Sequence, residues 1–280
     1  MIENLVCDII YGMIYHVSKK EEKEFLSYIG KDNPWTIFFY GDYFNYGLET
    51  KKARFFISKE QGKIDFTFLV YRNTLISFYS QSSNYDKKAA QDFLVEQKVS
   101  ALSGKESQIK PFLANLPDKK LDSLTLAILP RNQELKKYVL PEGYRIKKIQ
   151  DENDFKKLVD LLNFIDEFKK EDPNSKKTVS SLEENAKKGM TFLAVFNSKN
   201  EIVSSASSSA DNDVSAMIVS VCTKIGYRDK NLATCLVIYL AQDEFQKGKE
   251  YLALFFDNPL AAKIYHKIGF TDFGKYAMIH

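Results

Sequence analysis

The chain has 280 residues, of which 44% are hydrophobic and 28% charged. This balance is typical of a globular protein with a sizeable core. Forty lysine and arginine residues against 37 aspartate and glutamate residues give a formal charge of +3, and the two signs are interspersed, which disfavours a dedicated nucleic-acid binder. Three cysteines without C-x-x-C spacing, Cys7, Cys222 and Cys235, argue against a disulfide framework and against a zinc site.

The sequence shows no targeting or membrane-spanning pattern. Residues 1–4 include an acid where a secretory signal needs basic residues, and the longest apolar run, residues 232–241, is about half as long as a membrane span. We therefore expect a soluble protein of the reducing cytoplasm without a membrane partner.

The first half of the chain alternates short helical and strand patterns. In chain order the expected elements are a helix at 21–28, a helix opened by Asn33-Pro34, strands at 53–57, 63–71 and 74–79, a helix at 86–96, a strand near 99–102, a helix at 105–116 and a strand at 124–129.

Two prolines, a glycine and a charged stretch then interrupt the apolar pattern between Pro130 and Gly143. They predict a linker at residues 131–143 that separates a first domain, residues 1–130, from a second, residues 144–280.

The second half repeats nearly the same order of elements. The expected elements are a strand at 144–149, helices at 151–165 and 180–188, strands at 191–196, 202–210 and 214–223, a helix at 231–246, a strand at 251–256, a helix at 259–267 and a strand near 273–279. Turn signals between the three central strands favour an antiparallel meander. The shared order indicates an internal repeat of architecture.

The most informative segment runs from Val221 to Thr234 and joins a predicted strand to a long helix. A helix amino terminus offers unpaired N–H groups and the positive end of the helix dipole, so this loop could hold a pyrophosphate. Ala233 and Thr234 are small enough for a ligand to approach, and Arg228 and Lys230 add positive charge. Spacing alone equally allows a plain connection with a solvated basic loop.

This segment resembles the acetyl-CoA signature of the GNAT acyltransferase superfamily, Arg/Gln-x-x-Gly-x-Gly/Ala, as Arg228-x-x-Asn231-x-Ala233. Downstream, residues 256–270 are similar to the family's segment with an Asn, small residues and Tyr-x-x-x-Gly-Phe. The resemblance covers roughly residues 144–280. It implies an α+β protein of two GNAT-like domains, each a mixed, mostly antiparallel central sheet flanked by helices.

The first domain is expected to be a degenerate copy. At the place equivalent to the signature it has residues 81–89, without arginine or glycine in the pattern, so we expect no CoA there. Its aromatic run at residues 35–46 fits a core helix better than a ligand wall.

The resemblance also implies a ligand set, with acetyl-CoA as acyl donor and no metal. The implied cofactor-binding residues are Val221, Cys222, Thr223, Arg228, Asp229, Lys230, Asn231, Leu232, Ala233, Thr234 and Asn258. Backbone groups of Val221 and Thr223 would pair with the pantetheine arm, and residues 228–234 would hold the pyrophosphate.

Two of these residues need comment. Asn231 replaces the first glycine of the signature, so a side chain stands where the family brings a phosphate close to the backbone. Asparagine, however, adopts left-handed conformations more readily than most residues. Cys222 is interpreted as a small strand residue rather than a nucleophile, because no basic residue flanks it to lower its pKa.

Tyr265 matches the family's general acid, which would protonate the departing thiolate when an acetyl group passes directly to an amine. A buried helix tyrosine with a structural hydroxyl is the alternative. No general base is evident: Glu183, Glu184, Asp211 and Asp213 each fit a solvated helix or turn position better, and a water chain could take the proton.

We therefore expect an acetyl-CoA-dependent N-acetyltransferase whose acceptor is an amine of a small molecule or a peptide. Asn231 and the missing base motivate one alternative, a catalytically impaired acyl-CoA-binding sensor or scaffold. Another is a degenerate fold that associates through its aromatic-rich first half, which leaves a homodimer open. Divergence of the strands around Val221 and Leu254, next to an open groove at residues 228–233, would favour cofactor binding over plain association.

Overall fold

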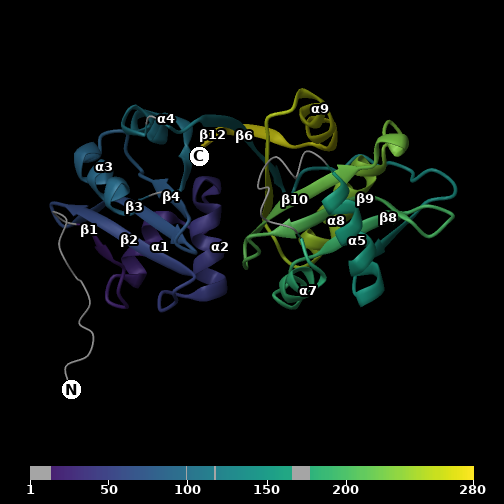
Figure 1. The fold of residues 1–280 in the computed structure, drawn as a ribbon, viewed down its shortest axis with the longest axis horizontal. Coiled ribbons are helices and arrows are strands. Elements are labelled where there is room, and N and C mark those ends of the chain that lie inside the picture. Colours follow the sequence, from purple (N-terminus) through teal and green to yellow (C-terminus); the bar gives the residue numbers. More distant parts are fainter. Residues whose placement is uncertain (1–13, 99, 117, 166–176) are drawn as a thin grey trace, which may run out of the picture. The chain divides into compact units, whose positions relative to one another are not determined.

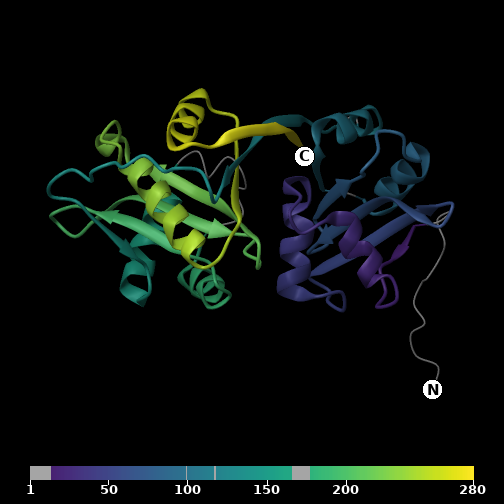
Figure 2. The ribbon, with the colours of Figure 1, turned by 180° about the vertical axis from the view of Figure 1, so that it is seen from behind.

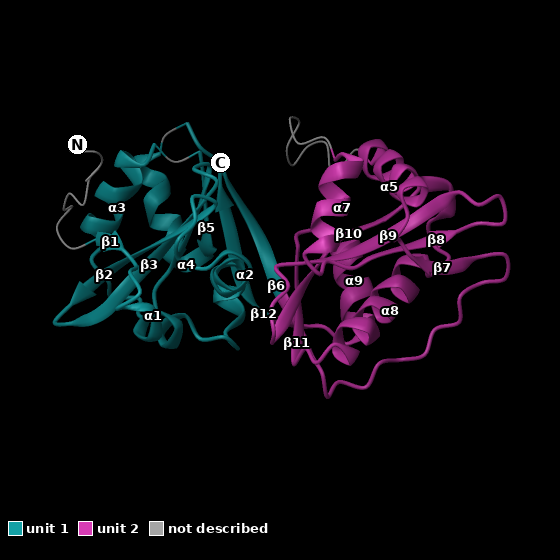
Figure 3. Cartoon of the chain, turned by 90° about the horizontal axis from the view of Figure 1, so that it is seen from below, with its two compact units in different colours: residues 1–126, 273–280 teal, residues 127–272 magenta. Residues whose placement is uncertain are grey.

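The computed structural model describes residues 14–98, 100–116, 118–165 and 177–280. Residues 1–4, Cys7 and Val99, where a strand was expected to begin, lie outside this description. The chain divides into two compact units, residues 1–126 with 273–280 and residues 127–272 (Figure 3). The first unit is therefore assembled from two segments that are distant in the sequence, and the stretch expected as a linker, residues 131–143, falls in the second unit.

The sheet of the first unit has the strand order β1-β2-β3-β4-β5-β12. Its strands are β1 (Ile14–His16), β2 (Ala53–Glu60), β3 (Lys63–Tyr71), β4 (Leu75–Tyr79), β5 (Ala101–Lys105) and β12 (Thr271–Ile279), the last belonging to this unit from Phe273 on. Its helices are α1 (Glu22–Ile29), α2 (Ile37–Tyr46), α3 (Lys87–Glu96) and α4 (Glu106–Ile109), with 3-10 turns at Pro34–Thr36 and Lys110–Asn115.

Two cores, one on each face, hold this sheet. Helices α1 and α2 pack on one face (Figure 2). There the rings of Phe25 and Phe55 lie 5.3 Å apart. Helices α3 and α4 pack on the other, where Phe68 and Phe93 stack at 4.6 Å. This second core is completed from β12 by the fully buried Ile279, so its apolar area is removed from water by a strand encoded far from the rest.

The sheet of the second unit has the strand order β6-β11-β10-β9-β8-β7. Its strands are β6 (Leu121–Pro130, in this unit from Ala127 on), β7 (Arg145–Lys148), β8 (Phe192–Phe196), β9 (Ile202–Ser209), β10 (Ser215–Thr223) and β11 (Tyr251–Phe256). Its helices are α5 (Glu152–Phe164), α7 (Val179–Lys187), α8 (Leu232–Gln246) and α9 (Pro259–Ile268), with a 3-10 turn at Ile225–Tyr227.

Helices again cover both faces of this sheet (Figure 1). Helices α8 and α9 pack on one face and α5 and α7 on the other, each over its own cluster of buried residues. Strands β8, β9 and β10 form the expected antiparallel meander, and β11 joins β10 in parallel. The α+β class and the mixed, mostly antiparallel sheet are thus confirmed.

Local sequence explains where elements differ from expectation. The helix expected at 105–116 is a short α-helix followed by a 3-10 segment, because Pro111 lacks the N–H that would continue the α-helical hydrogen-bond pattern. Strand β1 was not predicted, since three residues are too few to show an alternating pattern. None of the helices within the described residues combines the length and apolar composition needed to cross a membrane.

Candidate functional site

The parallel pairing of β10 with β11 ends well before either strand does. The described ladder joins Ser215 to Tyr251 and ends with Met217 opposite Ala253. Strand β10 continues to Thr223 and β11 to Phe256. An unpaired strand edge presents N–H and C=O groups to an extended partner. The end of the ladder agrees with the divergence expected around Val221 and Leu254, and the open groove expected beside it at residues 228–233 stays a prediction.

A β-bulge in β10 decides which side chains lie on the α8 face. The register with β9 shifts between Val219 and Cys222, and Ser220 has φ 54°. Regular alternation after Ile218 would place residue 222 on that face. The extra residue instead turns Val221 toward α8 and α9, where Tyr265 also packs, and turns Cys222 toward α5 and α7. The side chain of Cys222 therefore lies on the face opposite Tyr265, with its Sγ 3.2 Å from Ser205 Oγ.

Hydrogen bonds join the loop between β10 and α8 to the end of β10. Arg228 Nε donates a hydrogen bond to the Thr223 carbonyl at 3.1 Å, and Thr223 Oγ1 lies 2.8 Å from Ser204 Oγ. Asp229 and Asn231 both have left-handed backbones, with φ 63° and 58°. Asparagine tolerates this region better than most residues, which explains how it can occupy the glycine position of the signature.

Asn231 is the N-cap residue of α8, and its side chain does not cap the helix. The N–H groups of the first helical turn are thus not bound by the N-cap side chain and remain at the positive end of the helix dipole. Exposure changes sharply along the segment: residues 228–231 are exposed, Ala233 is half-buried, and Leu232 and Thr234 are buried.

Lys230 of this loop and Lys267 of α9 place their ammonium groups over aromatic rings. Lys230, which was predicted, places its Nζ 3.1 Å from Tyr144 Oη and 5.6 Å from the centre of the Tyr227 ring. Lys267 of α9 was missed. Its Nζ donates to Asn231 Oδ1 at 3.4 Å and lies 4.6 Å from the centre of the Tyr138 ring. Its position two residues after Tyr265 was the available signal, but only the fold brings it beside the loop.

Tyr265 lies on α9 with only 8% of its surface exposed. Its ring packs against Phe256 and Phe270, with centroids 5.8 and 5.9 Å away. Burial raises the pKa of its hydroxyl to about 12, so the group is protonated at neutral pH. In the part of the chain that the structure describes, no protein group hydrogen-bonds to this hydroxyl. The neighbouring His266 is exposed and pairs with Asp272 at 2.7 Å.

Asn258 is the N-cap residue of α9. Its Oδ1 accepts a hydrogen bond from the Leu260 N–H at 2.8 Å, which caps the helix. The side chain is exposed, and its amide nitrogen is the group still available to a ligand.

The carboxylates considered as bases lie away from Tyr265. Glu183 and Glu184 are on α7, which packs on the opposite face of the sheet. Asp211 and Asp213 precede β10, whereas the loop follows its far end, and strands rise roughly 3.3 Å per residue. Asp211 forms an ion pair with Lys249, while burial raises the pKa of this carboxyl.

The equivalent place in the first unit is closed. There the parallel ladder of β4 and β5 runs on to Phe78 opposite Gly104. The buried side chain of Gln108 forms hydrogen bonds with both backbone groups of Ser80. Its Nε2 donates to the carbonyl at 2.6 Å, and its Oε1 accepts from the N–H at 3.3 Å. Tyr85 Oη donates to the Gln108 carbonyl at 2.8 Å.

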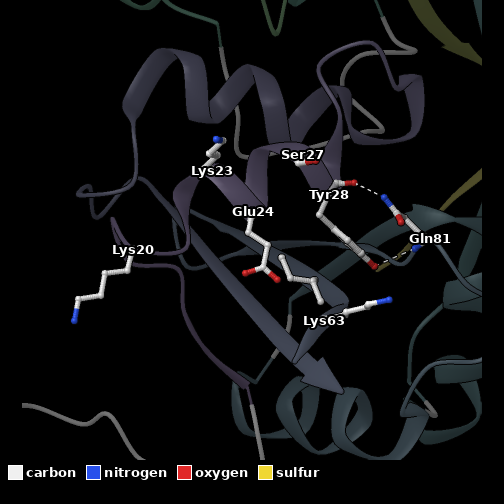
Figure 4. Close-up of a pocket in the computed structure, with 8 residues that line it drawn as sticks. Lys20, Lys23, Glu24, Ser27, Tyr28, Lys63 and Gln81 are labelled. Carbon is white, nitrogen blue, oxygen red and sulfur yellow. Dashed lines mark hydrogen bonds between the residues drawn. The ribbon is translucent and has the colours of Figure 1, made fainter. Parts of the chain in front are cut away.

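A surface depression of about 620 Å³ lies elsewhere, in the first unit (Figure 4). Two hydrogen bonds join Gln81 to Tyr28 along its side, at 2.8 and 3.0 Å. The lysines that line it are exposed, and its glutamate, Glu24, pairs with Lys59 at 2.6 Å. It contains none of the predicted site residues.

Comparison with known proteins agrees with this geometry. The model of the GNAT acetyltransferase family matches residues 1–279. The chain belongs to the GNAT acetyltransferase family. Its two compact units agree with the expected tandem arrangement, and the degeneracy of the first copy stays a prediction. A search of the curated proteins found no match.

Solved structures share the fold at low sequence identity. A GCN5-related N-acetyltransferase from Sphaerobacter thermophilus has a TM-score of 0.67 and 13% identity, over 95% of this chain and 94% of that one. A tandem GNAT protein from the clavulanic acid biosynthesis pathway has a TM-score of 0.59 and 8% identity, over 95% and 97% of the two chains. A GCN5-related N-acetyltransferase-like protein from Streptococcus suis has a TM-score of 0.57 and 14% identity, over 93% and 98%.

The donor groups of the second unit fit acetyl-CoA, the acyl donor that GNAT enzymes generally use. The unpaired part of β10 offers alternating backbone donors and acceptors to the amides of a pantetheine arm. The start of α8, which the Asn231 side chain leaves uncapped, and the exposed Arg228 are groups of the kind that bind a diphosphate.

Proposed function

We propose that the chain is an acetyl-CoA-dependent N-acetyltransferase that moves an acetyl group directly to an amine of a small molecule or a peptide. The observation that carries the proposal is that the β10–β11 ladder ends at Met217 and Ala253, which leaves the rest of β10 unpaired on that side. Val221, in this unpaired part, belongs to the same hydrophobic cluster as Tyr265. Membership of the GNAT acetyltransferase family supports it.

In this proposal the second unit binds the donor along β10. Backbone groups of Val221 and Thr223 pair with the pantetheine arm. The α8 amino terminus and the loop from Arg228 to Asn231 hold the diphosphate, with Asn258 further along the cofactor. The side chain of Cys222 takes no part, because it lies on the other face of the sheet.

Acetyl-CoA supplies an activated acetyl group as a thioester. The acceptor nitrogen forms a bond to the carbonyl carbon, and the bond from that carbon to sulfur breaks. Tyr265 gives its proton to the departing sulfur and regains one from solvent. Water takes the surplus proton of the amine, since the carboxylates considered as bases lie elsewhere.

The test is an acceptor screen with the full chain. Acetyl-CoA is incubated with polyamines, amino acids, aminoglycosides and peptides, while free thiol and acetylated product are measured. We expect thiol release that depends on one class of amine. Arg228→Ala serves as a binding control and should weaken acetyl-CoA binding by about 1–3 kcal/mol.

The outcomes separate the two roles considered for the protein. Binding of acetyl-CoA without transfer to any acceptor would favour the sensor or scaffold over the enzyme. No binding of acetyl-CoA at all would overturn the proposed function.

A further inference from the structure

A lysine from α9 meets the loop that starts α8. Lys267 Nζ donates a hydrogen bond to Asn231 Oδ1 at 3.4 Å and lies 4.6 Å from the centre of the Tyr138 ring. The amide oxygen and the ring face both attract an ammonium group. Lys267 is exposed, so a ligand can reach it.

Lys267 carries a charge that no protein carboxylate neutralises within the described residues. Some lysines of this unit have such partners: Lys247 pairs with Asp243 at 3.0 Å, and Lys188 pairs with Glu184 at 2.5 Å. The partner of Lys267 is a neutral amide at the long end of hydrogen-bond distance. An anionic oxygen would be a stronger acceptor for this ammonium.

The residue that orients Lys267 is the one that departs from the family signature. A glycine at position 231 would have no side chain to accept from Lys267. Asn231 keeps the left-handed backbone of the loop and adds the amide oxygen that holds the ammonium beside the N-cap of α8. The substitution therefore brings a cation to the place where a diphosphate would meet the helix.

We propose that Lys267 and Asn231 act together as a diphosphate-binding arm, in which Asn231 orients Lys267 and the Lys267 ammonium contacts the diphosphate of the cofactor. This inference rests on the proposed function, because it concerns the same loop. It also means that Asn231→Gly removes both a side chain near the phosphates and the anchor of Lys267, so the single variant cannot separate the two effects.

The test is a double-mutant cycle measured by calorimetry with CoA and with dephospho-CoA, which lacks only the 3′-phosphate. Lys267→Gln should weaken binding of both ligands about 10-fold, and Lys267→Arg should restore most of it. In the Asn231→Gly background the effect of Lys267→Gln should shrink to about 3-fold or less, because the ammonium is no longer oriented.

Lys187→Gln is the matched control. It makes the same charge change in the same unit, on α7 of the opposite sheet face, and should leave both affinities unchanged. Thermal unfolding of each variant should coincide with that of the wild type, since the substituted side chains are exposed.

Three results would overturn the inference alone while CoA still binds the wild type. The first is wild-type affinity of Lys267→Gln for both ligands. The second is a loss of affinity for CoA but not for dephospho-CoA, which would assign Lys267 to the 3′-phosphate. The third is additive effects of the substitutions at positions 231 and 267. Failure of the wild-type chain to bind either ligand would instead overturn the proposed function, and this inference with it.

Discussion

The ring of Tyr265 is buried against Phe256 and Phe270, and no described protein group hydrogen-bonds to its hydroxyl. Burial keeps the group neutral by raising its pKa to about 12. In that state it can donate a proton but cannot serve as a base near neutral pH.

Replacing Tyr265 by Phe keeps the ring packing and removes the proton. We expect the turnover rate to fall on the order of 10²–10⁴-fold, with little change in acetyl-CoA affinity. Because the pKa lies near 12, Tyr265 should cause no loss of rate below about pH 10. Steady-state kinetics over pH and calorimetry check both parts. A full-rate variant would remove Tyr265 from the mechanism, and equal losses of binding and stability would indicate a structural hydroxyl.

Asp42 is a second titratable residue with an unusual environment. It lies on α2 in the first unit, where burial raises the pKa of its carboxyl to about 7 and Arg72 offsets only part of that rise. The unfolded chain releases this proton near pH 4, whereas the folded chain holds it up to about pH 7. Asp42 therefore lowers the free energy of unfolding as pH rises through this range.

Asp42→Asn should remove that dependence. The variant should match the wild type at pH 4 and exceed its free energy of unfolding by about 1–3 kcal/mol at pH 8. Urea unfolding at the two pH values measures the difference. The same gain at both would show that ionisation of Asp42 is not its cause.

At the scale of elements, local sequence patterns predicted most strands and helices. They did not predict the strand register and the helix packing that shape the site. The apolar run that became β11 and the strand–loop–helix signature around Arg228 are readable from consecutive residues. The bulge at Ser220 and the end of the β10–β11 ladder depend on strand register, which tertiary pairing sets. Lys267 reaches the loop only through the packing of α9, so motif spacing could not assign it there.

Strands β4 and β5 show why the two copies differ. A Cβ added to Gly104 would lie 2.7 Å from the Phe78 carbonyl oxygen and 2.8 Å from Ile109 Cγ2. This close approach keeps the parallel pair of the first unit joined to its end.

Gly104→Ala should therefore destabilise the first unit by about 1–3 kcal/mol, because a backbone atom has to move. Denaturant unfolding checks the value, and Ser103→Ala, a change on the same strand, tests the loss of a side-chain hydrogen bond for comparison. Wild-type stability of Gly104→Ala would mean that the strands can separate at little cost.

At the scale of the whole molecule, the first unit depends on a segment encoded after the second. Turn residues and charge predicted a boundary within residues 131–143. The contacts instead divide the chain after Leu126 and return residues 273–280 to the first unit. Local sequence signals could not show this, because pairing of β12 with β5 is a long-range contact.

Ile279→Ala tests that dependence. Ile279 is fully buried in the core of the first unit, opposite Leu102 of β5. The truncation should cost about 2–5 kcal/mol and should weaken hydrogen-exchange protection in β4 and β5. Unchanged protection there would show that β12 adds little to this core.

The full chain should bind one acetyl-CoA. In the first unit the β4–β5 ladder continues as far as Phe78 and Gly104, and Gln108 hydrogen-bonds to the backbone of Ser80. The strand edge that would bind a pantetheine arm is therefore already paired. Calorimetric titration of the intact protein measures the stoichiometry. Two sites per chain would contradict the assignment of the first copy as degenerate.

The place of β12 also bears on synthesis. Domains generally fold as units while the chain is being made, with the earlier one first. Here residues 14–126 emerge without the strand that completes their sheet, and all of residues 127–272 must be translated before Phe273–His280 appear. Until then the free edge of β5 is open to pairing with another nascent chain. The order of translation thus makes completion of the first unit the later event, and exchange of β12 between neighbouring copies is the misassembly that this topology invites.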